Sequence, residues 1–333
     1  MEEMQVFDPK PVRKVFSRVG WSFCALTATL VLVQVALILC IKQFWPDGCW
    51  LTRSSTGKWL VTFVPLYIIA IPVGVLCMRK IPAYAPQQAN MSLKNFFIFL
   101  PICFFLIYSG NLVGNGLSSL FSGGNAENAL DTFAQDSNPI KFLFRVILAP
   151  LFEEYVTRKQ VIDRTRIYGE KTAVMLSAVL FALMHMNLFQ FFYAFLLGWV
   201  FGYIYLRTGR LRYCVILHSI VNFVGSIVAP FIMSKLDLEA LSSVNEMTPL
   251  EEVMAIYQEN AVGLMMYYGY LLLIGVLFIA GLILMIVQRK KLIWRAADAQ
   301  LPYTHQVKAV YLSAGMLVFL IFTAIMTVLS IVA

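Results

Sequence analysis

The sequence predicts an all-α membrane protein, a polytopic bundle of about nine transmembrane helices around a polar intramembrane cavity. Hydrophobic residues make up 60% of the 333 residues, charged residues make up 13%, and the mean hydropathy is +0.76. Soluble domains carry roughly 25% charged residues. The cavity is expected because acids and histidines still fall within apolar stretches. A charged side chain at bilayer depth costs about 2.5 to 3.5 kcal/mol to insert and so marks a candidate functional site.

Nine apolar stretches are the predicted spans, because about 20 helical residues cross a hydrocarbon core of ~30 Å. The first has a longer apolar core than a signal peptide and is expected to remain uncleaved. We group the spans into three parts: 1–139 with three spans and an outside loop, 140–233 as a catalytic core, and 234–333 with an outside segment and two spans. The spans are 19–41, 59–78, 96–113, 140–156, 172–186, 188–206, 213–233, 262–287 and 307–332.

The basic residues predict the orientation. With the N-terminus in the cytoplasm and the C-terminus outside, most of the 26 Lys and Arg residues fall in cytoplasmic loops. The formal charge of +8 therefore reflects topology and does not indicate nucleic-acid binding. A multi-pass protein of the cell membrane follows, with the lipid bilayer as its partner. The sequence shows no eukaryotic retention signal, which favours a prokaryotic source.

Two predicted outside segments are long and polar. Residues 114–138 are rich in Gly, Asn and Ser and are expected to form a solvated loop. Residues 234–261 are expected to hold a short surface helix, because Thr248, Pro249 and Glu251 have the chemistry of a helix start. The six cysteines form no CxxC pair, so neither a disulfide framework nor a cysteine metal site is predicted.

An adjacent pair of acids, Glu153 and Glu154, follows the apolar run of the predicted fourth span. Arg158 lies four residues after Glu154, a spacing that suits an ion pair on one helix face. Glu153 points about 100° away from Glu154, so the two acids are expected to have different roles. Pro150 cannot donate a backbone hydrogen bond and is expected to kink the helix just before the pair.

Two of the three histidines also lie in apolar segments. His185 follows Phe181 by one helical turn. His218 precedes Asn222 by four residues, so both should project from one helix face into a shared space. His305 lies in a polar segment and is expected at the surface. We expect a cavity that opens to the cytoplasmic side or laterally between helices.

The ordered set EExxxR, FxxxH and HxxxN resembles the CAAX protease and bacteriocin-processing family, also called the CPBP or Abi family, which includes the type II CAAX prenyl endopeptidase. The resemblance covers roughly residues 140–226. Thr157 and Lys159 stand where members of that family often carry Phe and Gly. The motif residues are Glu153, Glu154, Arg158, Phe181, His185, His218 and Asn222.

The resemblance implies hydrolysis of a peptide bond in a membrane-associated or prenylated protein or peptide. Glu153 and His185 would activate water, and His218 and Asn222 would stabilise the oxyanion. Glu154, Arg158 and Phe181 would support the site. A zinc ion held by Glu153, His185 and His218 is an alternative within the same reaction. A proton-coupled transporter and a non-catalytic immunity protein are alternatives of other classes.

Overall fold

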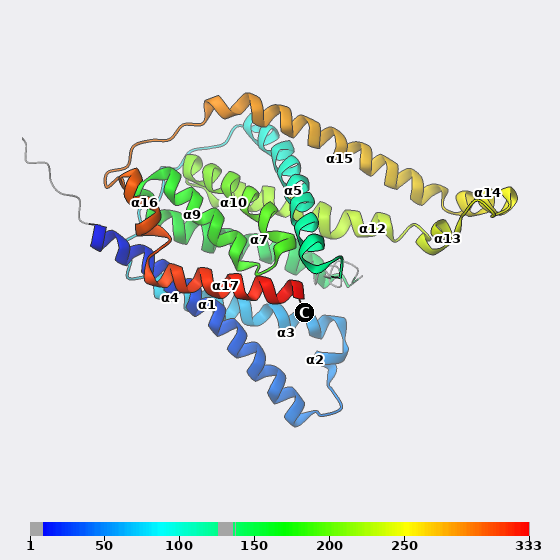
Figure 1. Ribbon diagram of the computed structural model, residues 1–333, viewed down its shortest axis with the longest axis horizontal. Helices are drawn as coiled ribbons and strands as arrows, with labels where there is room; N and C mark the ends of the chain where they lie inside the picture. Colours follow the sequence, from blue (N-terminus) through cyan, green and yellow to red (C-terminus); the bar gives the residue numbers. More distant parts are fainter. Residues whose placement is uncertain (1–8, 126–135, 137, 333) are drawn as a thin grey trace, which may run out of the picture.

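The computed structural model describes residues 9–125, 136 and 138–332 (Figure 1). Every regular element within these residues is helical, which confirms the predicted all-α class. Seven helices in the described part are long and apolar enough to cross a membrane, so the chain is a multi-pass membrane protein. These candidate spans are Lys10–Phe44, Ser55–Met78, Leu93–Ser122, Leu188–Thr208, Leu211–Met233, Ala261–Lys291 and Ala314–Ile331.

The prediction of nine spans is therefore not confirmed, and the difference lies in the predicted fourth and fifth. The fourth is a continuous run of short helical segments that carries several charged residues: η2 (Phe142–Leu148), α7 (Ala149–Glu154), η3 (Tyr155–Gln160) and α8 (Val161–Thr165). The fifth is α9 (Glu170–Met184), whose 15 residues extend about 22 Å and fall short of the ~30 Å core. Leu176 and Leu180 of α9 are fully buried. Helix α9 is thus apolar because protein surrounds it, whereas the fourth segment leaves Phe142, Ile147 and Leu151 exposed.

The remaining helices keep the predicted order with shifted ends. Helix α1 begins well before residue 19, and α5 extends into the predicted loop 114–138; residues 126–135 and 137 of that loop lie outside the described part. The predicted surface helix is α14, which begins at Leu250 with Pro249 as its N-cap. The long helices are α1 (Pro9–Phe44), α3 (Ser55–Val64) with η1 (Pro65–Ala70) and α4 (Ile71–Met78), α5 (Leu93–Ser122), α10 (Leu188–Thr208), α11 (Leu211–Phe223) with η5 (Val224–Val228) and α12 (Ala229–Met233), α15 (Ala261–Gln288) with η6 (Arg289–Lys291), and α17 (Ala314–Val332). The short ones are α2 (Trp50–Arg53), η4 (Arg166–Tyr168), α13 (Leu238–Ser243), α14 (Leu250–Glu259) and α16 (Tyr303–Val310).

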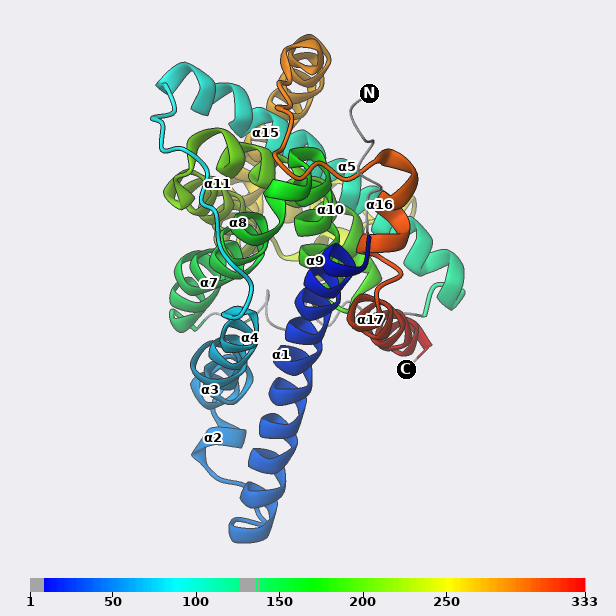
Figure 2. The ribbon, with the colours of Figure 1, turned by 90° about the vertical axis from the view of Figure 1, so that its left-hand side faces the viewer.

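Helices from both ends of the chain enclose the central segments. Helix α10 packs against α9 and α5, and α15 packs on the outer side of α5 (Figures 1 and 2). On the other side, α1 packs against α4 and α17. Gly20 and Gly315 allow α1 and α17 to touch, because a Cβ atom on Gly20 would lie 2.2 Å from the Gly315 carbonyl carbon. The close α1–α17 and α1–α4 contacts fix α1 beside the central segments, where it borders the site described next.

Candidate active site

Glu154 and Arg158 form a fully buried ion pair, as their spacing predicts. Arg158 Nε lies 2.8 Å from Glu154 Oε2, and Nη2 lies 3.3 Å from Oε1, so the guanidinium holds both carboxylate oxygens. Arg158 Nη1 also donates to Ser177 Oγ at 2.8 Å, and its guanidinium lies 4.6 Å from the centre of the Phe181 ring. Sequence reasoning did not identify Ser177, although it lies on the same face of α9 as Phe181, four residues earlier. These contacts fix the Glu154 carboxylate in place.

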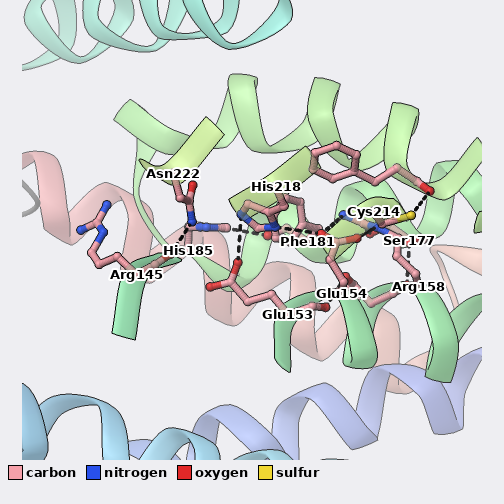
Figure 3. A network of polar contacts seen from close by, with 12 residues as sticks. Arg145, Glu153, Glu154, Arg158, Ser177, Phe181, His185, Cys214, His218 and Asn222 are labelled. Carbon is pink, nitrogen blue, oxygen red and sulfur yellow. Dashed lines mark hydrogen bonds and ion pairs between the residues drawn. The ribbon is translucent and has the colours of Figure 1, made fainter. Parts of the chain in front are cut away.

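His218 is the second partner of Glu154 and connects the two acids. Its Nδ1 lies 3.0 Å from Glu154 Oε1. An ionised carboxylate only accepts hydrogen bonds, so Nδ1 carries the proton of this bond. The other ring nitrogen, Nε2, is directed toward Glu153 and lies 3.8 Å from its Oε2 (Figure 3). Phe201 stacks on the imidazole with ring centres 5.6 Å apart. Glu154 thus orients His218, a relationship that the motif spacing did not reveal.

Glu153 differs from its neighbour in both exposure and contacts. Its side chain is 21% exposed, whereas that of Glu154 is fully buried. Glu153 faces a cavity, and Glu154 lies behind it (Figure 3). The prediction that the two adjacent acids point in different directions is therefore confirmed.

His185 lies directly after α9 and reaches the same cavity as His218. Its Nδ1 lies 2.8 Å from the carbonyl oxygen of Phe181, which can only accept, so Nε2 is the nitrogen without the proton in the neutral ring. The Phe181 ring packs edge to face on both imidazoles, at 5.1 Å from His185 and 5.7 Å from His218. Phe181 therefore separates and orients the two histidines.

Asn222 also faces the cavity, and Pro150 explains how it is held. The turns of η2 are π-helical, in which an N–H bonds to the carbonyl five residues earlier, as Ala149 does to Phe144. The next donor in this register would be residue 150, but proline has no N–H. The carbonyl oxygen of Arg145 is thus free to accept a hydrogen bond from Asn222 Nδ2 at 2.9 Å. Pro150 therefore affects the site by lacking an N–H at this position, and the kink that the sequence predicts just before Glu153 stays a prediction.

The cavity has a volume of about 240 Å³ and brings together the four predicted catalytic residues, Glu153, His185, His218 and Asn222, with the predicted supporting residue Phe181. Glu154 and Arg158 lie behind its wall. Helix α1 contributes Leu26, Thr27 and Leu30 to the opposite wall, although its apolar sequence gave no signal of a role at the site. The remaining lining residues are Phe63, Leu66, Ile71, Phe144, Arg145, Ala149, Met184, Met186, Gln190, Tyr193 and Leu197.

Comparison with known families identifies this part of the chain. Residues 135–224 match the family model of the type II CAAX prenyl endopeptidase Rce1-like proteins. We call residues 135–224 the CAAX protease segment, after the family model that they match. The match contains all the motif residues of the resemblance, and it supports a protease-like hydrolase. No curated protein and no solved structure matches the chain.

The described side chains of the CAAX protease segment are not grouped as a metal site. The zinc alternative requires Glu153, His185 and His218 to converge on one ion. Within the described residues, no three side chains of His, Cys, Asp or Glu are grouped closely enough to hold one. The bond from His218 Nδ1 to Glu154 does not itself argue against zinc, because Nε2 remains free and a zinc-bound histidine often donates its other N–H to a carboxylate. Within the described residues, Glu153, His185 and His218 are therefore not grouped as a three-ligand zinc site.

Proposed function

We propose that the chain is an intramembrane endopeptidase that hydrolyses a peptide bond of a membrane-associated or prenylated protein or peptide. The observation that carries this proposal is the single cavity faced by a carboxylate, two imidazoles and an amide, all within the CAAX protease segment. These are the groups that general acid–base hydrolysis requires.

Glu153 is the proposed general base. Its carboxylate faces the cavity and has no arginine partner, unlike that of Glu154, so it can accept a proton from water. His185 presents Nε2 as an acceptor and helps to orient the same water. The oxygen of that water attacks the carbonyl carbon of the substrate as the proton moves to Glu153.

His218 and Asn222 are the proposed oxyanion donors. Glu154 stabilises the positive form of His218, which then donates from Nε2 to the developing negative charge. Asn222 uses one N–H for the Arg145 carbonyl and has a second N–H for the oxyanion. Glu153 next transfers its proton to the amide nitrogen, the C–N bond breaks, and a carboxylate and an amine are released.

The proposed surroundings follow the predicted topology. The N-terminus lies in the cytoplasm, the C-terminus lies outside, and the protein resides in a prokaryotic cell membrane. Substrate then enters from the cytoplasmic side or between helices. Helix α1 supplies an apolar wall through Leu26 and Leu30, which suits a lipidated or otherwise apolar peptide.

The direct test uses the purified full chain in lipid vesicles with a farnesylated synthetic peptide that carries a fluorophore and a quencher on either side of the modified cysteine. We expect cleavage, with ¹⁸O from labelled water in the new carboxylate. Glu153→Ala and His218→Ala should abolish cleavage, whereas His305→Ala should not, because His305 does not line the cavity. Cleavage that persists in both site variants would contradict the proposal.

A further inference from the structure

A groove runs between α1 and α4, two helices that lie side by side (Figure 2). Its volume is about 840 Å³, and it shares no lining residue with the cavity that Glu153 faces. The proposed chemistry uses none of its residues. Among those that line it are Lys14, Arg18 and Trp21 of α1, Leu76 and Cys77 of α4, and Lys80 in the turn after α4.

Three cations share this groove without an acid beside them. Lys14 and Arg18 are four residues apart and Trp21 follows three residues later, so all three lie on one face of α1. Lys80 lines the groove from the other side. No described residue that lines the groove is Asp or Glu. In the part of the chain that the structure describes, none of the three cations forms an ion pair. The groove therefore offers an anion a site with no competing carboxylate.

The three positive charges lie at one end of the groove. Helices α1 and α4 touch at Gly74, where a Cβ atom would lie 3.2 Å from the Ser22 carbonyl oxygen. From this level toward the start of α1, Arg18 lies about 6 Å and Lys14 about 12 Å along the helix axis. Helix α4 leaves the same level for its end at Met78, and Lys80 lies two residues farther. The cations thus gather where α1 begins and α4 ends.

Apolar side chains line the groove nearer the contact between the helices. Trp21 and Val73 are the neighbours of Ser22 and Gly74 in sequence, and Leu76 follows on α4. Trp21 is 49% exposed and Leu76 is 55% exposed, so both present apolar surface to a ligand. Both helices belong to candidate membrane spans, and tryptophan is enriched where hydrocarbon meets the headgroups. The groove therefore changes from cationic to apolar in the direction that leads into the membrane.

We propose that this groove binds an anionic phospholipid, with the phosphate among Lys14, Arg18 and Lys80 and an acyl chain along Trp21 and Leu76. Basic pockets between transmembrane helices suit anionic headgroups. Cations that only set the orientation of the chain need not gather in one groove. A free phosphate would match the charges but would leave the apolar part of the groove without a partner. The proposal does not depend on the peptidase function.

Cys77 gives the groove a native reporter. It is exposed and lines the groove, whereas Cys40 is exposed on α1 outside it. The full chain, washed free of native lipid in a neutral detergent, is treated with N-ethylmaleimide and with phosphatidylglycerol, phosphatidylcholine or glycerol 3-phosphate. Peptide mass spectrometry gives the alkylation rate of each cysteine. We expect phosphatidylglycerol alone to slow the reaction of Cys77, in a saturable way, and to leave Cys40 unchanged. Buried Cys103 and Cys214 should stay unreactive, which shows that the protein is folded.

Neutral substitutions test the three cations. Lys14→Gln, Arg18→Gln and Lys80→Gln should each raise the phosphatidylglycerol concentration for half protection of Cys77 about fivefold or more, the effect typical of one cation near an anionic lipid. Arg79→Gln is the matched control, because it removes the same charge beside Lys80 from a residue that does not line the groove. Its half-protection concentration should stay close to that of the wild type.

Each alternative has its own result. Equal protection of Cys77 by phosphatidylcholine would show that acyl chains suffice and would overturn the role of the cations. Equal protection by glycerol 3-phosphate would make the groove a site for free phosphate and overturn the lipid. A shift in Arg79→Gln as large as that in Lys80→Gln would mean diffuse attraction rather than a site, and unchanged alkylation with all three compounds would mean that nothing of this class binds. Peptide cleavage enters none of these measurements, so the proposed function stands or fails separately.

Discussion

His218 Nδ1 lies 3.0 Å from Oε1 of Glu154, the same carboxylate that Arg158 grips through Nε at 2.8 Å. Both oxygens of Glu154 are thus engaged within the protein, whereas Glu153 faces the cavity. The two adjacent acids therefore differ in role: Glu154 is buried and orients His218, whereas Glu153 faces the cavity. Four predictions follow from the contacts around this arrangement, and a fifth tests its centre.

Loss of the Arg158 guanidinium should destabilise the fold. Arg158→Ala leaves the Glu154 carboxylate buried without its cation, which costs about 3 to 5 kcal/mol. Arg158→Lys keeps the charge but cannot hold both carboxylate oxygens, so the loss should be smaller. Lys159→Ala is the control, since Lys159 is 46% exposed and its ion pair with Asp163 contributes at most about 1 kcal/mol. Thermal unfolding in detergent measures the stability of all three variants. An Arg158→Ala protein as stable as Lys159→Ala would show that the Glu154–Arg158 ion pair does not stabilise the fold.

Restoring a backbone donor at residue 150 should disturb Asn222. In Pro150→Ala the new N–H can bond to the Arg145 carbonyl and displaces Asn222 from it. We expect kcat to fall about 10²-fold, the effect typical of a lost oxyanion donor, while KM changes little. Steady-state kinetics on the farnesylated peptide measures both constants. The double variant Pro150→Ala, Asn222→Ala should lose little more kcat than Pro150→Ala alone. If the two losses add in full, Pro150 does not act through Asn222.

Ionised Asp136 should stabilise the fold, so the free energy of unfolding should fall when acidic pH protonates this carboxyl. Burial opposes ionisation of this carboxyl, but hydrogen bonds from the Ser55 hydroxyl, from the Asn138 backbone N–H and from Trp59 Nε1 at 2.8 Å outweigh it. Together with the charge of Lys141, they hold the pKa of Asp136 below its usual value. A depressed pKa contributes stability that is complete above the unfolded value of about 3.9 and is lost as the pH falls through the folded value.

The measurement for Asp136 is the unfolding temperature of the wild type and of Asp136→Asn between pH 2.5 and 6. The wild type should lose more stability than the variant as the pH falls below about 4. Parallel curves would show that Asp136 does not contribute to this dependence. Ser55→Ala, which removes one of the donors, should reduce the difference only in part.

Helix α1 should control access to the site. Leu30 lines the cavity, whereas Leu32 on the same helix is 68% exposed. Leu30→Trp should fill part of the cavity and lower kcat/KM about 10-fold or more, since a misplaced substrate reacts far more slowly. Leu32→Trp adds the same side chain away from the cavity and should be neutral. Equal kinetics in the two variants would mean that α1 does not border the substrate.

Much of the fold and of the site follows from sequence patterns, for identifiable reasons. The i, i+4 spacing of Glu154 and Arg158 and of His218 and Asn222 is a local property of a helix, so it correctly predicted which side chains share a face. The number of spans was not predictable from hydropathy alone. A helix surrounded by protein, such as α9, is as apolar as one surrounded by lipid.

The parts that the sequence did not predict depend on contacts between distant segments. Leu26 and Leu30 of α1 are ordinary residues of an apolar helix, and only tertiary packing places them at the cavity. The bond between His218 and Glu154 joins residues 64 positions apart. Asn222 depends on the π-helical register before Pro150, which a proline alone does not specify. Each of these features requires the packed structure.

The most direct test of the central claim is the cleavage rate of Glu153→Gln, measured beside its thermal stability on the reconstituted full chain. The account predicts a loss of about 10² to 10⁴-fold in kcat, because glutamine cannot accept the proton from water, with an unfolding temperature close to that of the wild type. Glu154→Gln should instead lower the unfolding temperature, because Arg158 loses its charged partner. A Glu153→Gln protein that cleaves the peptide at the wild-type rate would contradict the account.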